Sequence, residues 1–269
     1  MGPPVSLTIA GSDSGGGAGI QADLRTFAAL GVFGTSAVTA VTAQNTSEVR
    51  GVEVVRPSFV DLQIETVLAD LAVASVKTGM LATSATVAVV GRRAAAGELP
   101  NLVVDPVLVA STGRPLLDDD GPSAYLHHLL PHALVATPNT REATLLTGIA
   151  IETTADMARA AARLADTGAR VVVVKGGHLA GDDAPDVVLA DGELRTLEAG
   201  RVTTTNDHGT GCTLSAAIAA LLASGRDPLP AVALAKEFVT RALVGSARWR
   251  LGAGRGPLDH FGWGDQPAG

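Results

Sequence analysis

Residues 206–220 read NDHGTGCTLSAAIAA, a glycine-rich turn that leads directly into an apolar helical pattern. The first backbone N–H groups of a helix have no partner inside it, and together with the helix dipole they attract anions. Gly209 and Gly211 lack a Cβ atom, so an oxyanion can approach this backbone closely. We therefore expect an anion-binding site at the start of this helix.

Cys212, the only cysteine of the chain, lies in the first turn of the expected helix. Because a helix N-terminus favours a thiolate, we expect a lowered pKa for this thiol. Cys212 is then a candidate base, and Asp207, five residues earlier, is the rival. A single cysteine also excludes an internal disulfide framework, which agrees with a reducing cytoplasm.

Short runs of valine, isoleucine and leucine alternate with helical patterns throughout the chain. The strands that we predict cover residues 7–10, 36–41, 75–77, 102–104, 134–136 and 171–174. Their lack of polar alternation indicates a parallel sheet that is buried on both faces. Helical patterns occupy residues 21–30, the segment that follows an N-cap at Ser58, and residues 84–96, 123–130, 154–167, 213–224 and 228–250. The chain therefore predicts repeated βα units.

Residues 185–197 depart from this pattern, because two short apolar runs flank Asp191-Gly192. Asp-Gly is a tight-turn signal, so we predict a β-hairpin at the sheet edge. No internal repeat, linker or domain boundary is evident. We expect a single domain over residues 1–269, with a loosely ordered, Gly/Pro-rich tail after about residue 252.

The composition narrows the class of protein. Apolar residues make up 46% of the 269 residues, aromatic residues make up 3%, and the net charge is −7. The negative charge argues against a nucleic-acid partner. The N-terminus has no signal-peptide pattern, and no apolar run is long enough to span a membrane, so we expect a cytoplasmic protein.

Polar residues cluster directly after the predicted strands, at Gly11-Ser12-Asp13, Gln44-Asn45, Lys77, Asp105, Asn139 and Lys175. In open α/β sheets, ligands bind outside the carboxyl ends of the strands, so these residues predict a common site. The glycine loop at residues 10–19 resembles a phosphate loop but lacks the spacing of the Walker A and dinucleotide motifs. A simple flexible turn is the alternative there.

The other motifs also allow two interpretations. Gln44 suits a neutral heterocycle such as an aminopyrimidine, or a turn cap. Asp105 and Glu142 suit Mg2+, although an acid in the first turn of a helix, as at Glu142, is favourable by itself. Lys175, which precedes two glycines, suits nucleotide phosphates, or it is a solvated lysine.

The combination of these segments resembles hydroxymethylpyrimidine/phosphomethylpyrimidine kinases of thiamine biosynthesis, in the ribokinase-like superfamily. The matching segments lie in family order at residues 10–23, 43–46, 77–81, 105–107, 137–139, 175–178 and 208–213. The resemblance implies an α/β fold of three α/β/α layers, with a central, mostly parallel sheet, helices on both faces and a small edge β-hairpin. It also implies that ATP and Mg2+ phosphorylate 4-amino-5-hydroxymethyl-2-methylpyrimidine, and then convert the monophosphate to the diphosphate.

The resemblance further implies a role for each matching residue. Gln44 and Asp23 would bind the pyrimidine, in a pocket lined by Gly11, Ala18, Met80 and Val107. The ATP phosphates would contact Lys175, Asn139, Thr210, Gly209 and His208. Asp105 and Glu142 would place Mg2+. Catalysis would use Cys212 as the base, with Lys175 and the N–H groups of Thr210, Gly211 and Cys212 facing the transferred phosphoryl group.

Two other functions fit parts of the pattern. A pyridoxal or pyridoxine kinase of the same superfamily would also take a small aromatic ring with a hydroxymethyl arm. A non-catalytic nucleotide- or vitamin-binding protein would need no base, so Cys212, Asp105 and Lys175 argue against it. By analogy with ribokinase-like relatives, we expect a homodimer.

Overall fold

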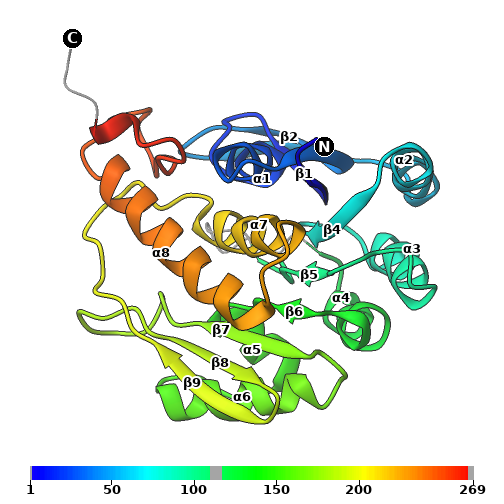
Figure 1. Cartoon of the computed structure of the whole chain (residues 1–269). Helices are drawn as coiled ribbons and strands as arrows, with labels where there is room; N and C mark the ends of the chain where they lie inside the picture. Colours follow the sequence, from blue (N-terminus) through cyan, green and yellow to red (C-terminus); the bar gives the residue numbers. More distant parts are fainter. Residues whose placement is uncertain (1, 110–116, 266–269) are drawn as a thin grey trace.

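The structure is a computed structural model that describes residues 2–109 and 117–265 (Figure 1). In these residues, nine strands form one sheet in the order β3-β2-β1-β4-β5-β6-β7-β8-β9. The strands are β1 (Val5–Asp13), β2 (Phe33–Gln44), β3 (Val49–Val54), β4 (Val73–Thr78), β5 (Val103–Val104), β6 (Val135–Ala136), β7 (Val171–Lys175), β8 (Asp186–Ala190) and β9 (Glu193–Leu197).

The centre of the sheet is parallel, from β2 through β1, β4, β5 and β6 to β7. The predicted hairpin is confirmed: β8 and β9 are antiparallel, lie at one edge, and are joined at Asp191 and Gly192, both with positive φ. At the other edge, β3 pairs antiparallel with β2. The sequence did not predict β3, because Arg50, Gly51 and Glu53 interrupt its apolar pattern.

Helices cover both faces of the sheet (Figure 1). The α-helices are α1 (Gly19–Ala29), α2 (Pro57–Asp70), α3 (Ser84–Ala95), α4 (Gly121–Ala124), α5 (Thr140–Thr147), α6 (Thr154–Ala165), α7 (Thr210–Ala223) and α8 (Pro228–Ser246). Three short elements complete the described chain: the π-helix η1 (Tyr125–Leu129) and the 3-10 helices η2 (Leu130–His132) and η3 (Trp263–Asp265).

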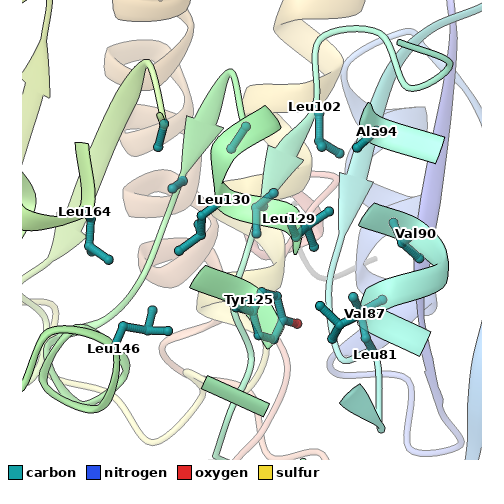
Figure 2. Close-up of a cluster of buried hydrophobic side chains, with 14 of the residues drawn as sticks. Leu81, Val87, Val90, Ala94, Leu102, Tyr125, Leu129, Leu130, Leu146 and Leu164 are labelled. Carbon is teal, nitrogen blue, oxygen red and sulfur yellow. The ribbon is translucent and has the colours of Figure 1, made fainter. Parts of the chain in front are cut away.

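Alternate residues of the central strands feed two separate cores, as expected for a sheet buried on both faces. On one face, Val104, Val172 and Val174 pack with α2, α3, η1, α5 and α6, and Figure 2 shows part of this cluster around Tyr125. On the other face, Val103 and Val173 pack with α1, α7 and α8. The three-layer α/β/α arrangement is therefore confirmed.

Several helix ends differ from the sequence prediction. The helix expected after a Ser58 N-cap begins at Pro57, because proline suits the first helical position. The pattern at 123–130 is split between α4, η1 and η2, where Pro131 interrupts α-helical bonding. The last long helix ends at Ser246 rather than Arg250.

We expected a loosely ordered tail after residue 252, but its described part packs against the fold. Gly254 N donates to Thr46 Oγ1 over 3.1 Å, and His208 N donates to the carbonyl of Gly256 over 3.0 Å. A Cβ atom on Gly256 would lie 1.9 Å from Asn206 Oδ1. The glycines of this segment thus permit close packing rather than disorder. In the part of the chain that the structure describes, no helix is long and apolar enough to cross a membrane.

Candidate functional site

A cavity of about 650 Å3 lies where the sequence placed the site, outside the carboxyl ends of the parallel strands. The cavity walls come from the ends of β1, β2, β4, β5 and β7, the start of α5 and the start of α7. Most of the predicted site residues line it: Gly11, Ala18, Gln44, Met80, Asp105, Val107, Asn139, Glu142, Lys175, His208, Gly209, Thr210, Gly211 and Cys212.

The start of α7 packs closely against the loop between β1 and α1. Gly209 has a φ of +89°, and a Cβ atom there would lie 1.9 Å from the carbonyl oxygen of Gly17. A Cβ atom on Gly17 would lie 2.5 Å from the His208 ring. These glycines therefore allow the two loops to touch. The contact brings the β1–α1 loop, which we predicted to border the pyrimidine, beside the predicted anion site at the start of α7.

Asp13, at the end of β1, organises the loop between β1 and α1. Its carboxylate accepts hydrogen bonds from the backbone N–H groups of Gly15, Gly17 and Ala18, and from His208 Nε2 at 3.0 Å. Burial by itself raises the pKa of Asp13, but the hydrogen bonds from His208 and the loop outweigh it and lower the pKa. Asp13 therefore stays ionised and acts as the centre of this loop.

Gln44 lies beside this network. Its Nε2 atom is 3.1 Å from His208 Nε2, and its backbone N–H and carbonyl both bond to the hydroxyl of Ser14. The Asp13–His208 pair thus borders the side-chain amide of Gln44 at the cavity wall. His208, which we expected at the ATP phosphates, lies beside Gln44, which we expected at the pyrimidine.

Asp23 does not reach the cavity surface, although the resemblance assigned it to the pyrimidine. Its side chain on α1 is fully buried, accepts a 2.6 Å hydrogen bond from Thr8, and forms an ion pair with Lys77 at 2.8 Å. Burial alone lowers the pKa of Lys77, but the neighbouring anions, led by Asp23, outweigh it and raise the pKa. The pair therefore forms a charged floor under the cavity.

On the opposite side, Lys175 lies next to the start of α7. Its Nζ atom is 2.8 Å from Asp105 Oδ1, and a Cβ atom on Gly211 would lie only 3.1 Å from Nζ. Burial by itself lowers the pKa of Lys175, but the negative charges of Asp105 and Glu142 outweigh burial and raise the pKa. The ammonium group therefore stays charged. A cation and a helix N-terminus thus face the same part of the cavity, which suits a transferring phosphoryl group.

Glu142 and Asn139 cap α5, as the alternative interpretation proposed. Asn139 Oδ1 accepts from Glu142 N at 2.9 Å, while Glu142 Oε2 accepts from Asn139 N at 2.8 Å. Burial raises the pKa of Glu142 to about 7, although Lys175 opposes this shift. Capping leaves Glu142 at the cavity wall beside Asp105, so a role with Mg2+ is compatible with it.

No group of three or more metal-binding side chains occurs among residues 2–109 and 117–265. Magnesium needs fewer, because it is commonly held by one or two carboxylates, substrate phosphate and water. The buried carboxylates of Asp105 and Glu142 both face the cavity and fit this donor set.

The expected low pKa of Cys212 is wrong. Burial raises the pKa of the thiol to about 11, even though Lys77 and a hydrogen bond from the N–H group of Gly19 act in the opposite direction. The sequence showed the helix start but not how strongly the surrounding residues desolvate the thiol, which borders the cavity. Cys212 is therefore a protonated thiol at neutral pH.

Two further expectations at the start of α7 change. The N–H group and the hydroxyl of Thr210 both donate to the carbonyl of Asp207, which leaves the N–H groups of Gly211 and Cys212, two residues that line the cavity, as the candidate anion donors. The Asp207 carboxylate forms a two-pronged ion pair with Arg255. This pairing weakens Asp207 as the rival base.

Among the cavity residues, sequence reasoning missed Arg201 and Arg255, and it included Asp13 and His178 in its motifs without giving them a role. Lys77 was noted after its strand but received no role, although a lone lysine in an apolar strand signals a buried partner. Arg201 and Arg255 carried no such signal, because their segments have no regular pattern.

The family model and the curated relatives agree on one family. The family model described as phosphomethylpyrimidine kinase matches residues 13–259. The chain is 51% identical to the hydroxymethylpyrimidine/phosphomethylpyrimidine kinase of Rhizobium meliloti, over 96% of this chain and 97% of that one. It is 47% identical to the chloroplastic thiamine biosynthetic bifunctional enzyme TH1 of Arabidopsis thaliana, over 96% of this chain and 50% of that one. The structure of Staphylococcus aureus pyridoxal kinase in complex with AMP-PCP and pyridoxal is also similar, with a TM-score of 0.88, 35% identity, and coverage of 98% and 95%.

Proposed function

The chain belongs to the phosphomethylpyrimidine kinase family, and from this premise we propose the reaction that it catalyses. It transfers the γ-phosphoryl group of ATP to the hydroxymethyl oxygen of 4-amino-5-hydroxymethyl-2-methylpyrimidine in thiamine biosynthesis. It then phosphorylates the resulting monophosphate to the diphosphate. The observation that carries this function is that Gln44 and Met80 share one cavity with Lys175 and the start of α7.

The acceptor binds on the side of β1 and β2. The Gln44 amide can donate and accept, which suits the ring nitrogen and amino group of an aminopyrimidine. Met80 packs against Gly11, where a Cβ atom would lie 2.3 Å from Met80 Cε, and Ala18 and Val107 complete an apolar wall. This arrangement directs the hydroxymethyl arm toward α7.

The phosphoryl group of ATP binds between Lys175 and the N–H groups of Gly211 and Cys212. These groups are in place before reaction, and they face the negative charge that grows on the equatorial oxygens during transfer. Asp105 and Glu142 are the residues that would hold Mg2+, which supplies charge neutralisation between the phosphates when bound. Asn139 caps α5 beside them and borders the phosphates.

The hydroxyl proton of the acceptor goes to Cys212 in this assignment. Because the resting thiol is protonated, it first releases its proton to the solvent of the open cavity, and Lys77 and the N–H group of Gly19 stabilise the resulting thiolate. The thiolate then takes the hydroxyl proton, which returns Cys212 to its protonated form. The base takes the hydroxyl proton late in the transfer, because phosphoryl transfer depends mostly on positioning and charge stabilisation. Lys77 and Asp23 act beneath the acceptor rather than on it.

An ADP-release assay with hydroxymethylpyrimidine, and then with its monophosphate, tests both steps. We expect ADP release with each acceptor. In the same assay, Gln44→Ala should raise KM for the pyrimidine with little change in KM for ATP. Equal changes in both constants would contradict a pyrimidine contact, and no ADP release with either acceptor would refute the function.

Pyridoxal is the second candidate acceptor, because pyridoxal kinases at 35% identity share the fold over nearly the whole chain. Turnover of hydroxymethylpyrimidine and pyridoxal should be compared side by side at equal concentration. We expect the pyrimidine to have the higher kcat/KM, and the opposite order would reverse the assignment.

A homodimer in the cytoplasm stays a prediction of the family resemblance. Light scattering of the purified protein at micromolar concentration tests the oligomeric state. A mass close to 27.1 kDa would contradict the dimer.

A further inference from the structure

One arginine holds together the whole loop that follows β7. The guanidinium group of Arg201 donates to four backbone carbonyls: those of Gly177 (2.7 Å), Leu179 (2.7 Å), Gly181 (2.9 Å) and Asp183 (3.0 Å). These carbonyls belong to every second residue of the loop at 176–184. The loop therefore wraps around one side chain.

The backbone beside Arg201 adds to this contact. The N–H group of Arg201 donates to the carbonyl of Asp182 over 2.8 Å, and the N–H group of Ala184 donates to the carbonyl of Ala199 over 2.8 Å. Between them, Asp183 and Gly200 form an isolated antiparallel bridge. The segment after β9 thus fixes one end of the loop, and the Arg201 side chain fixes the rest.

The loop needs such a partner because of its composition. Gly176, Gly177 and Gly181 have large backbone freedom in the unfolded chain, and Gly181 adopts a φ of +111°. A guanidinium group presents five donors in a rigid planar fork, and it can serve several carbonyls at once. Lysine, with one rotatable ammonium group, cannot reproduce this pattern.

The position of the loop connects Arg201 to the phosphate donor. The loop starts directly after Lys175, and Gly177, His178 and Arg201 all line the cavity on the side away from Gln44. Burial, followed by the positive charges of Arg141 and Lys175, lowers the pKa of His178. His178 therefore presents an uncharged imidazole ring to the cavity at neutral pH.

We propose that Arg201 is a positioning residue for the nucleotide: it holds the loop at 176–184 as the wall against which ATP lies, with His178 as the side chain that the wall presents. This proposal rests on the proposed use of ATP. Arg201 acts through the loop, so its replacement should weaken nucleotide binding and leave the pyrimidine side intact.

The test compares Arg201→Lys with Arg195→Lys, a matched change on β9, where the arginine forms an ion pair with the exposed Glu193. For each variant, calorimetry gives the Kd for ADP, hydrogen exchange gives the protection of amides 176–184, and steady-state kinetics gives both KM values. For Arg201→Lys we expect a rise of about tenfold in Kd for ADP and in KM for ATP, because several hydrogen bonds to the loop are lost. Loop amides should exchange faster, KM for the pyrimidine should change less than twofold, and Arg195→Lys should match the wild type.

Unchanged Kd for ADP together with faster loop exchange would overturn the proposal, and so would an equal rise in both KM values. If Arg201→Lys does not fold, His178→Ala tests the same wall, and it should raise Kd for ADP while loop exchange stays unchanged. ADP binding does not require turnover. A wild-type protein that binds ADP but phosphorylates no pyrimidine would therefore refute the proposed function and leave the role of Arg201 testable.

Discussion

The replacement Asp23→Asn tests whether Asp23 supports the fold or contacts the pyrimidine. Asn has nearly the shape of Asp and still offers a hydrogen-bonding oxygen, but it removes the charge. In the structure that charge is paired with Lys77 at 2.8 and 2.9 Å, and both side chains have zero exposure. The variant would therefore leave an ammonium group buried without a counter-ion.

The expected cost follows from this burial. Removing one partner of a buried ion pair typically destabilises a protein by about 3–5 kcal/mol, because the remaining charge is uncompensated. Typical domains have only about 5–15 kcal/mol of stability in total. We expect Asp23→Asn to lose about 3 kcal/mol or more of its free energy of unfolding, toward the lower end because Asn retains a contact with Thr8.

Urea unfolding followed by circular dichroism measures this loss. The matched variants are Lys77→Met and the double variant Asp23→Asn/Lys77→Met. The double variant should recover much of the lost stability, since it leaves no unpaired charge, whereas two independent effects would add. If Asp23→Asn unfolds within about 1 kcal/mol of the wild type and only raises KM for the pyrimidine, the reasoning fails and Asp23 contacts the acceptor.

Three other predictions concern single residues. The raised pKa of Cys212 predicts that alkylation of the free enzyme by iodoacetamide accelerates about tenfold per pH unit from pH 7 to 10; a plateau near pH 8.5 would contradict it. Burial lowers the pKa of His260 to about 4, so the unfolded chain takes up a proton first as the pH falls. Unfolding free energy should then drop by about 3 kcal/mol between pH 6.5 and 4, and His260→Gln should abolish this drop in urea titrations. Gly256→Ala should cost about 1–3 kcal/mol because its Cβ atom meets Asn206, whereas Gly200→Ala, with open space around it, should not; equal thermal shifts would contradict the close contact.

The sequence predicted the layers of the fold and the edge of the sheet where the site lies. Continuous apolar strands such as 171–174 can only be buried on both faces, and polar residues directly after them must gather at one edge. This logic placed Asp105, Asn139 and Lys175 correctly at one cavity. It could not place Arg201, because its four acceptors are carbonyls of an irregular loop and leave no pattern in the sequence.

The burial of individual site side chains was the other property that could not be predicted from the sequence. The positions of Asp23 on a helix and Cys212 at a helix start were both predicted. Their environments depend on how α1 packs on β1 and on α7, and on how α7 packs on β4, which are tertiary properties. Burial reversed the expected pKa shift of Cys212, and it placed Asp23 in an ion pair with Lys77 at zero exposure.

In the proposed reaction Cys212 has two separable roles, because its backbone N–H group would face the phosphoryl group while its thiol is the candidate base. Cys212→Ala removes the thiol and keeps the N–H group at the start of α7. We therefore expect unchanged Kd for ADP and a loss of kcat of about 10²-fold or more, the usual scale for loss of a general base. The remaining activity would come from Lys175 and the N–H groups of residues 211 and 212, which meet the charge of the transferring group. Near-normal kcat in Cys212→Ala would overturn the thiol as base and leave the helix start as the catalytic device.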